Sequence, residues 1–261
     1  MRDTIAVYSL WRDSEPHLSR TLSQLEDLES LDYDFEYYFY ENDSKDNTVE
    51  ILSSWLKNRT GSFKHEKLDK QKFGSTTEFA RVELLSDCRN KCKQLGYDSK
   101  SKYSLLIDSD IIFNKENLQR SLSLIDDCVA VSPNVRQNIP DFVGEKSDTS
   151  YYDVFPFKDR FGSPGNYWDD CPFKNGIDRM KWFLGNPVEA KSCFGGFFLT
   201  KSNIFKRIKW STSGASEHVN FCEELNFFGK ILVDPKNEVY TEIDLSKHDL
   251  NKFRLSAKSQ L

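Results

Sequence analysis

Hydrophobic runs alternate with amphipathic stretches along the first half of the chain. Residues 4–10 form a short apolar run typical of a strand, and leucines then recur at helical spacing from residue 18 to residue 28. The aromatic run at residues 35–40 predicts a second strand, and an amphipathic helix follows between residues 49 and 56. The order strand, helix, strand, helix is typical of βαβ units, so we expect a parallel sheet with right-handed crossovers.

This pattern continues to about residue 133. Further strands are expected at residues 62–68, 105–113 and 128–132, and further helices at residues 76–95 and 115–125. On the longer helix, Arg81 and Arg89 either face solvent or reach toward the edge of the sheet. The sequence therefore predicts a doubly wound α/β unit over residues 1–133.

The strand expected at residues 105–113 is interrupted by two acids, Asp108 and Asp110. Unpaired buried carboxylates are costly, so something must compensate them. Because strand side chains alternate between faces, Asp108 and Asp110 should project the same way and Ser109 the other. Two convergent carboxylates at the end of a strand favour a Mg²⁺ or Mn²⁺ site that also holds phosphate oxygens. The alternative is an ordinary strand-to-helix turn.

Periodicity is lost from residue 134 to residue 189, in a loop-rich segment with proline, glycine and many aromatic residues. A structureless stretch of this length is usually functional, disordered or wrongly read as a loop, and its aromatic content argues against disorder. A single strand is then predicted over residues 188–200, where Gly195 and Gly196 mark either a close backbone approach or a β-bulge. A helix at residues 217–228, strands at 231–234 and 238–243, and a polar tail from residue 245 complete the chain.

Composition narrows the class of protein. The net charge of −5 argues against a general nucleic-acid binder, which would need a basic surface. No stretch approaches the length of a membrane span, and the N-terminus lacks a signal-peptide pattern. The 6 cysteines are scattered and form no Cys-X-X-Cys pair, so we expect reduced thiols. These features predict a cytoplasmic protein without an integral membrane segment. It would be bacterial or, if viral, would lie in the cytoplasm of the host cell.

The order of motifs resembles the GT-A fold of nucleotide-sugar-dependent glycosyltransferases over nearly the whole chain. Four segments are more narrowly similar to the fungal capsule-associated mannosyltransferase family: YENDSKDNT at residues 40–48, ARVELLSDCRNKC at 80–92, YYDVFPFKDRFG at 151–162 and VEAKSCFGG at 188–196. The resemblance implies one α/β GT-A domain with a mostly parallel, Rossmann-like central sheet flanked by helices. Residues 1–133 would bind the nucleotide sugar, residues 134–244 would form the loop-rich acceptor and catalytic half, and residues 245–261 the polar tail.

The resemblance also implies an activity, the transfer of a sugar such as mannose from a GDP- or UDP-sugar to a hydroxyl of a glycan or glycoprotein. In the donor site, Asp110 would bind Mn²⁺ or Mg²⁺, Asp108 would support the ion or contact the ribose with Ser109 beside it, and Asp43 would hold the nucleobase or ribose. The ion would stabilise negative charge on the departing β-phosphate. Arg81 is a candidate for the diphosphate, because a guanidinium pairs with two oxygens, or else it forms an ordinary surface ion pair.

The acceptor would need polar groups for its hydroxyls and an aromatic face for its CH groups. Candidates in the loop-rich half, each of which could instead be structural, are Asp153, Asp159, Arg160 and Trp168, together with the paired Gly195 and Gly196.

The candidate catalytic residues are Glu217 and His218. Many GT-A enzymes carry an acidic pair that opens a helix twelve residues before a glycine, and Glu217-His218 stands in that register before Gly229. His218 occupies the place of an Asp that often serves as general base. Either Glu217 or His218 is the base, or the enzyme retains configuration and needs none; His218 could also make only a local hydrogen bond. His248 resembles a late metal-ligand histidine or is an ordinary surface residue.

Two other classes of function compete with this interpretation. A nucleotidyltransferase would need a glycine-rich loop after the first strand to cradle a triphosphate, whereas residues 10–16 contain no glycine. A non-catalytic binding protein on the same scaffold would be expected to lose the acid pair, which this chain keeps.

Overall fold

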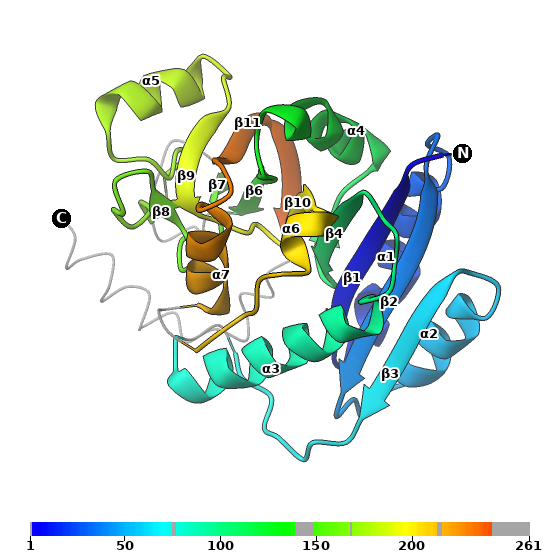
Figure 1. Cartoon of the computed structure of the whole chain (residues 1–261). Coiled ribbons are helices and arrows are strands. Elements are labelled where there is room, and N and C mark those ends of the chain that lie inside the picture. Colours follow the sequence, from blue (N-terminus) through cyan, green and yellow to red (C-terminus); the bar gives the residue numbers. More distant parts are fainter. Residues whose placement is uncertain (1, 75–76, 139–148, 168, 213–215, 242–261) are drawn as a thin grey trace.

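The computed structural model describes residues 2–74, 77–138, 149–167, 169–212 and 216–241 (Figure 1). The strands are β1 (Thr4–Trp11), β2 (Asp34–Asn42), β3 (Gly61–Glu66), β4 (Tyr103–Asp108), β5 (Ile111–Ile112), β6 (Ala130–Asn138), β7 (Thr149–Tyr151), β8 (Lys158–Asp159), β9 (Val188–Ser192), β10 (Phe197–Lys201) and β11 (Ile231–Thr241). The helices are α1 (Glu15–Leu28), α2 (Thr48–Leu56), α3 (Phe79–Leu95), α4 (Lys115–Leu124), a 3₁₀ turn η1 (Ile125–Asp127), α5 (Gly176–Phe183), α6 (Ser202–Phe205) and α7 (Glu217–Leu225).

All strands join one sheet in the order β3-β2-β1-β4-β10-β6-β11-β9-β8, with β5 paired to β11 and β7 to β6. The first four strands pair in parallel, as the βαβ order predicts. Beyond β4 the sheet is mixed, because β10 runs antiparallel to both β4 and β6 while β6 and β11 are parallel. The predicted α/β class with a parallel core is therefore confirmed.

Helix α3 packs against β1 and β2 and meets α7, so these two helices lie side by side (Figure 1). Its inward side carries polar as well as apolar residues, since Ser86, Arg89 and Lys93 are buried along with Val82. These positions recur every three or four residues and therefore lie on one face of the helix. A helix that buries charges in this way brings polar groups to the interior of the molecule, at the meeting point of the two halves of the chain.

The single strand predicted over residues 188–200 is wrong. Strands β9 and β10 are separate, and Gly195 and Gly196 form a turn between them with φ of +69° and +65°. Two successive left-handed residues interrupt the extended chain, in a conformation that glycine adopts without a steric cost, and β10 then runs in the same direction as β9 at another place in the sheet. As a result β10 enters the middle of the sheet, whereas β9 pairs near its edge with β11 and β8.

Two other expectations are corrected. The strands predicted at 231–234 and 238–243 are one strand, β11, whose register against β6 shifts between Asp234 and Glu238. The segment predicted as loop contains β7, β8 and α5, a helix capped by Asn175, whose side chain accepts hydrogen bonds from the N–H groups of Ile177 and Asp178. The polar tail, His248 and Trp168 lie outside the described residues.

All six cysteines are buried free thiols, as their scattered positions predict. Among the helices of the described ranges, none combines the length and the apolar character needed to cross a bilayer.

Candidate active site

Three adjoining cavities lie beyond the ends of the parallel strands. The central cavity, of about 250 Å³, is lined by residues including Arg12, Lys72, Arg81, Arg89, Asp108 and Asp110. The inner cavity, of about 180 Å³, shares the last four of these and adds Tyr152, Asp153, Phe194, Gly196, Glu217 and His218 among others. The outer cavity, of about 510 Å³, shares Arg12 and Lys72 with the central one and adds Asp13, Asp43, Lys45, His65, Lys67, Asp69 and Lys70 among others. The shared residues make the three cavities one interrupted groove.

The acid pair lies where the central and inner cavities meet. Strand β4 ends at Asp108, and Ser109 and Asp110 form a turn, so strand alternation does not determine the direction of Asp110. Both acids nevertheless line both cavities. Ser109 is held against α1, since its Oγ accepts a hydrogen bond from the Ser14 hydroxyl (3.3 Å) and its carbonyl accepts one from the Thr21 hydroxyl (2.8 Å). The turn is thus fixed from the α1 side, and the carboxylates line the groove.

Arg89 joins the acid pair to α7. Its Nε donates a hydrogen bond to Oε1 of Glu217 (2.9 Å), and its Nη2 donates one to Oδ1 of Asp108 (3.1 Å). The guanidinium also lies 4.7 Å from the ring centroid of Phe194. Burial alone would lower the pKa of Arg89, but the carboxylates of Asp108 and Glu217 raise it above its usual value. Arg89 is therefore a permanently charged link between a strand of the first half and a helix of the second.

Glu217 opens α7 and is buried in the wall of the inner cavity. Burial alone would raise its pKa, but positive charge from His218, when protonated, and from Arg89 lowers the pKa well below the usual value. Its other oxygen, Oε2, accepts a hydrogen bond from the Ser216 hydroxyl at 3.2 Å. Glu217 is consequently an ionised carboxylate whose orientation is fixed by its neighbours.

His218 is also buried and strongly confined. Its ring stacks on Phe194 with a centroid separation of 3.6 Å, and its Nδ1 accepts a hydrogen bond from the indole N–H of Trp210 (3.5 Å). Nε2 lies 3.3 Å from Oε1 of Glu217. Burial, together with the charge of Arg89, lowers the pKa of His218, so the imidazole is neutral at neutral pH. Ring stacking on Phe194 and the hydrogen bond from Trp210 together hold the His218 side chain beside Glu217.

Asp153 is the other carboxylate in the inner cavity, and the glycine turn orients it. Its Oδ2 accepts a hydrogen bond from the N–H of Gly195 at 2.7 Å. Burial raises the pKa of Asp153 to about 7, and the charges of Asp108 and Glu217 act in the same direction. The next residue, Gly196, accepts a hydrogen bond from the N–H of Asp108 at 2.8 Å. The glycine turn therefore contacts an acid on each side of the inner cavity.

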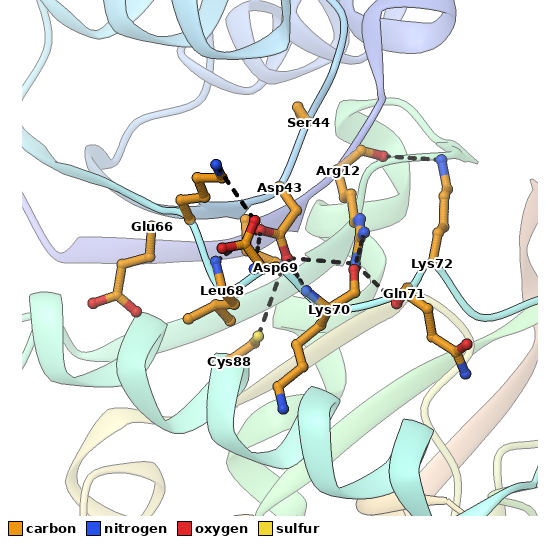
Figure 2. A network of polar contacts seen from close by, with 12 residues as sticks. Arg12, Asp43, Ser44, Glu66, Leu68, Asp69, Lys70, Gln71, Lys72 and Cys88 are labelled. Carbon is orange, nitrogen blue, oxygen red and sulfur yellow. Dashed lines mark hydrogen bonds and ion pairs between the residues drawn. The ribbon is translucent and has the colours of Figure 1, made fainter.

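Asp43 has a different environment from the one the resemblance implies. It adopts a left-handed φ of +60°. Its Oδ1 accepts hydrogen bonds from the N–H groups of Leu68 (2.7 Å) and Asp69 (2.8 Å), and its Oδ2 accepts one from Lys70 (3.3 Å), as Figure 2 shows. Burial alone would raise the pKa of Asp43, but these hydrogen bonds and one from Asn42 lower it. The carboxylate fastens the loop after β3, and its contact with a nucleotide stays a prediction.

Among the predicted acceptor residues, the structure brings Asp153 and Gly196 into the inner cavity, whereas Gly195, Asp159 and Arg160 line none of the three cavities. Oδ1 of Asp159 accepts hydrogen bonds from the N–H groups of Phe161 and Ser163 and closes a turn. Arg160 forms an ion pair with Asp178 on α5, with 3.2 Å between Nε and Oδ2. These contacts are structural, and the role of both residues toward an acceptor stays a prediction.

Arg81 lies in the wall between the central and inner cavities, as a residue of a diphosphate site would. Its charge lowers the pKa values of both Asp153 and Glu217, which places it close to the acidic end of the groove. The sequence left open whether Arg89 faces solvent or the edge of the sheet, and it gave no indication of Arg12 or Lys72. For Arg89 a signal was present, because it follows Val82 by seven residues, two helical turns along the same face.

The donor atoms fit a hard divalent cation. Ions such as Mg²⁺ are usually held by one or two carboxylates together with substrate phosphates. Asp108 and Asp110 supply two carboxylates beside a cavity, although one oxygen of Asp108 already accepts from Arg89. Across the described ranges there is no group of three or more His, Cys, Asp or Glu side chains that could hold a metal. An ion here would therefore need phosphate or water oxygens to complete its shell.

Comparisons with known proteins give a match by fold alone. No family model and no curated protein matches the chain. S. aureus TarS 1-349 is similar at 16% identity, with a TM-score of 0.54 over 92% of this chain and 60% of that chain. Its complex with UDP-GlcNAc is similar at 15% identity, with a TM-score of 0.52 over 95% of this chain and 61% of that chain. The mannosyltransferase PcManGT from Pyrobaculum calidifontis, in complex with GDP-Man and Mn²⁺, matches at 10% identity and a TM-score of 0.56 over 98% of this chain and 61% of that one.

This chain thus spans about 60% of the length of these structures. The likeness confirms a GT-A-like fold, a mixed sheet with parallel core strands flanked by helices. The narrower resemblance to the fungal capsule-associated family finds no support from a family model.

Proposed function

We propose that this chain is a glycosyltransferase that moves a sugar from a nucleotide-diphosphate sugar to a hydroxyl of a glycan or glycoprotein. The proposal rests on the way positive and negative side chains are separated along the groove. Cations outnumber carboxylates in the central cavity, whereas carboxylates outnumber cations in the inner cavity. The two cavities meet at Asp108 and Asp110, where the bond between sugar and diphosphate would lie.

At the cationic end, the central cavity has four cationic side chains against the two carboxylates of the acid pair. This arrangement favours a diphosphate, whose negative charge grows as the sugar departs. Asp110, with Asp108, would hold Mn²⁺ or Mg²⁺, which supplies a Lewis acid for the leaving β-phosphate. Arg81 would contact the same phosphates from α3, and Ser109 would border the donor between the two acids.

At the acidic end, the inner cavity has four carboxylates against two arginines. Glycosyl transfer proceeds through a sugar that gains positive charge, as in oxocarbenium-like transition states, and nearby carboxylates stabilise that charge. Asp153 would accept a hydrogen bond from the acceptor hydroxyl or donate one to it. The aromatic faces of Tyr152 and Phe155 would contact the CH groups of the acceptor sugar. The transferring carbon would then lie between a cationic leaving-group site and an acidic acceptor site.

The proton of the acceptor hydroxyl has two candidate destinations. Glu217 is ionised and faces the inner cavity, but its low pKa makes it a weak base until substrates change its surroundings. His218 is neutral, but its one lone pair, on Nδ1, already accepts a hydrogen bond from Trp210, and Phe194 confines its ring, so it would take a proton only after that hydrogen bond breaks. An enzyme that retains configuration would use neither as base, and Glu217 would then act by its charge. We propose Glu217 and His218 as the catalytic pair on this basis.

The donor is proposed as a GDP- or UDP-sugar. PcManGT is described with GDP-Man and TarS with UDP-GlcNAc, and both share the fold of this chain. GDP-mannose follows only from the narrower family resemblance. The outer cavity, next to Asp43, is large enough for either base.

A thermal-shift titration with UDP, GDP and their sugars, each with and without Mn²⁺, tests the proposal. We expect one nucleotide class to raise the melting temperature, because a ligand that binds only the folded chain stabilises it. A donor sugar of that class should then be hydrolysed or transferred in the presence of Mn²⁺. Asp110→Asn should abolish the turnover, whereas the matched change Asp127→Asn, at an exposed acid on η1, should not. No response to any nucleotide would contradict the proposal and favour a binding protein without catalysis.

A further inference from the structure

A network of polar contacts fixes the loop at residues 67–73, between the outer and central cavities (Figure 2). Asp43 accepts hydrogen bonds from three successive N–H groups of this loop. From β1, Arg12 donates to the carbonyls of Gln71 (Nη1, 3.2 Å) and Lys70 (Nη2, 2.5 Å). The loop backbone is therefore held through both its donors and its acceptors.

This network places two cations at the boundary of the cavities. Arg12 and Lys72 line both the outer and the central cavity. The side chain of Arg12 is only 17% exposed and lies 3.8 Å from Asp43, between Nη1 and Oδ2. Lys72 reaches back, with its Nζ 3.5 Å from the Arg12 carbonyl and 3.1 Å from Oδ2 of Asp13. The two cations are thus held close to each other by the protein before any ligand binds.

The charge of this region is opposite to that of the whole chain. Side chains lining the outer and central cavities comprise seven Lys and Arg residues and five Asp residues, in a protein with a net charge of −5. Arg89 is already engaged by Asp108 and Glu217. The other cations at the central cavity are Arg81 on α3 and, on the opposite wall, Arg12 and Lys72, which also pair with Asp43 and Asp13 at the outer cavity. Such a focused positive region attracts an anion of high charge.

We propose that Arg12, Lys72 and Arg81 form a cationic clamp for the donor diphosphate, so that the nucleotide binds without a divalent ion. This inference rests on the proposed function. Where carboxylates alone line a diphosphate site, the ion must bridge two sets of negative charge before the nucleotide can bind. Here the protein supplies compensating charges itself, so an ion held by Asp110 would stabilise the leaving group and would contribute little to nucleotide affinity.

The clamp also gives Asp43 a role distinct from contact with the base. Asp43 is a positioning residue, since its carboxylate holds the loop that carries Lys72. Asp43→Gly suits the left-handed backbone but releases the loop, so nucleotide affinity should fall. Asp43→Asn keeps an oxygen for the N–H groups of Leu68 and Asp69, and it should recover part of that affinity.

Isothermal titration of the purified chain with GDP and with UDP, in EDTA and in Mn²⁺, tests the clamp. For the nucleotide that binds, we expect dissociation constants that differ by less than about threefold between the two conditions. Lys72→Ala should weaken binding in EDTA by about tenfold, the usual effect of losing one charge-assisted hydrogen bond. Lys72 is 55% exposed, so this variant should fold normally. The matched change Lys174→Ala, at an exposed lysine outside all three cavities, should leave affinity unchanged.

The outcomes separate the clamp from the function on which it rests. Binding in Mn²⁺ but not in EDTA would overturn the clamp and leave the glycosyltransferase proposal standing. Unchanged affinity in Lys72→Ala would also overturn the clamp. Binding of neither nucleotide in either condition would overturn both proposals. Binding in EDTA that weakens in Lys72→Ala and with added salt would support the clamp, because salt screens exposed charges.

Discussion

Replacing Asp153 by Asn should stabilise the protein at alkaline pH and leave it unchanged at acid pH. Burial raises the pKa of Asp153 to about 7 from its ordinary value of 3.8. The folded state therefore holds this proton more tightly than the unfolded state does. Stability from this group is complete below the unfolded pKa, falls as pH rises toward 7, and is lost above the folded pKa. Asn mimics the protonated acid and removes this loss.

The size of the effect follows from the shift. Three pKa units correspond to about 4 kcal/mol, which we reduce to about 2–3 kcal/mol because the Asp153 side chain is partly exposed to solvent. The hydrogen bond from the N–H of Gly195 should survive, since Asn keeps a carbonyl oxygen. For a chain of this length, the melting temperature of Asp153→Asn at about pH 8 should rise by roughly 4–10 °C.

The assay is chemical unfolding of both proteins at about pH 4, 6 and 8, in EDTA so that no divalent ion adds charge beside Asp108. The difference between the two proteins should grow with pH. Asp127→Asn, at an exposed acid, serves as the matched control and should show no such trend. A difference that is constant across pH, or a variant less stable than the parent at about pH 8, would refute the reasoning. Sugar transfer should fall in the same variant if Asp153 contacts the acceptor, as we propose.

Three further outcomes are expected. Arg89→Met should destabilise the fold by about 3–5 kcal/mol in urea unfolding, because Asp108 and Glu217 lose their buried partner. Adding Glu217→Gln to this variant should recover part of that loss, whereas additive effects of the two substitutions would argue against the pairing. In transfer assays, an inverting enzyme should lose about 10²–10⁴-fold in kcat for only one of Glu217→Gln and His218→Ala, whereas equal small losses would indicate that neither is the base. Burial lowers the pKa of Lys93 to about 8, so the free energy of unfolding should rise with pH from about 8 to 10.5. Lys93→Met should abolish that rise and add up to about 3 kcal/mol of stability at pH 7. If the variant unfolds with the same pH profile as the parent, buried Lys93 is not the cause of the rise.

The sequence predicts the parallel half of the fold well, because local patterns determine it. Apolar runs for the strands and leucine spacing for α1 are local signals, and the structure confirms β1 and β2 near their expected limits, whereas the strand expected at residues 105–113 is divided into β4 and β5. The ends of these strands then place the acid pair at the edge of the sheet where ligands of such folds bind. Asp108 and Asp110 could therefore be named as site candidates from sequence.

The second half depends on contacts that no local pattern records. Hydrophobic residues on both sides of Gly195 and Gly196 suggest one strand, and only the φ values of the glycines and the strand pairings show that the chain turns there and moves to another place in the sheet. Likewise, whether Arg89 faces solvent or the interior depends on α7, which lies far along the chain and supplies Glu217. Asp43 is similar, since its partners are backbone N–H groups, which carry no sequence signature.

The glycine turn has a consequence for how this site could change specificity. Gly196 contacts Asp108 and Gly195 contacts Asp153, both through the backbone, and a side chain at Gly196 would overlap Ile111. The separation between Asp108 and Asp153 is therefore set by main-chain atoms of two adjacent residues. Substitutions elsewhere in the cavity walls can alter which sugar or acceptor fits without altering that separation. Libraries for directed evolution of new donor or acceptor preferences should hold the glycine pair constant and vary the walls on either side of it.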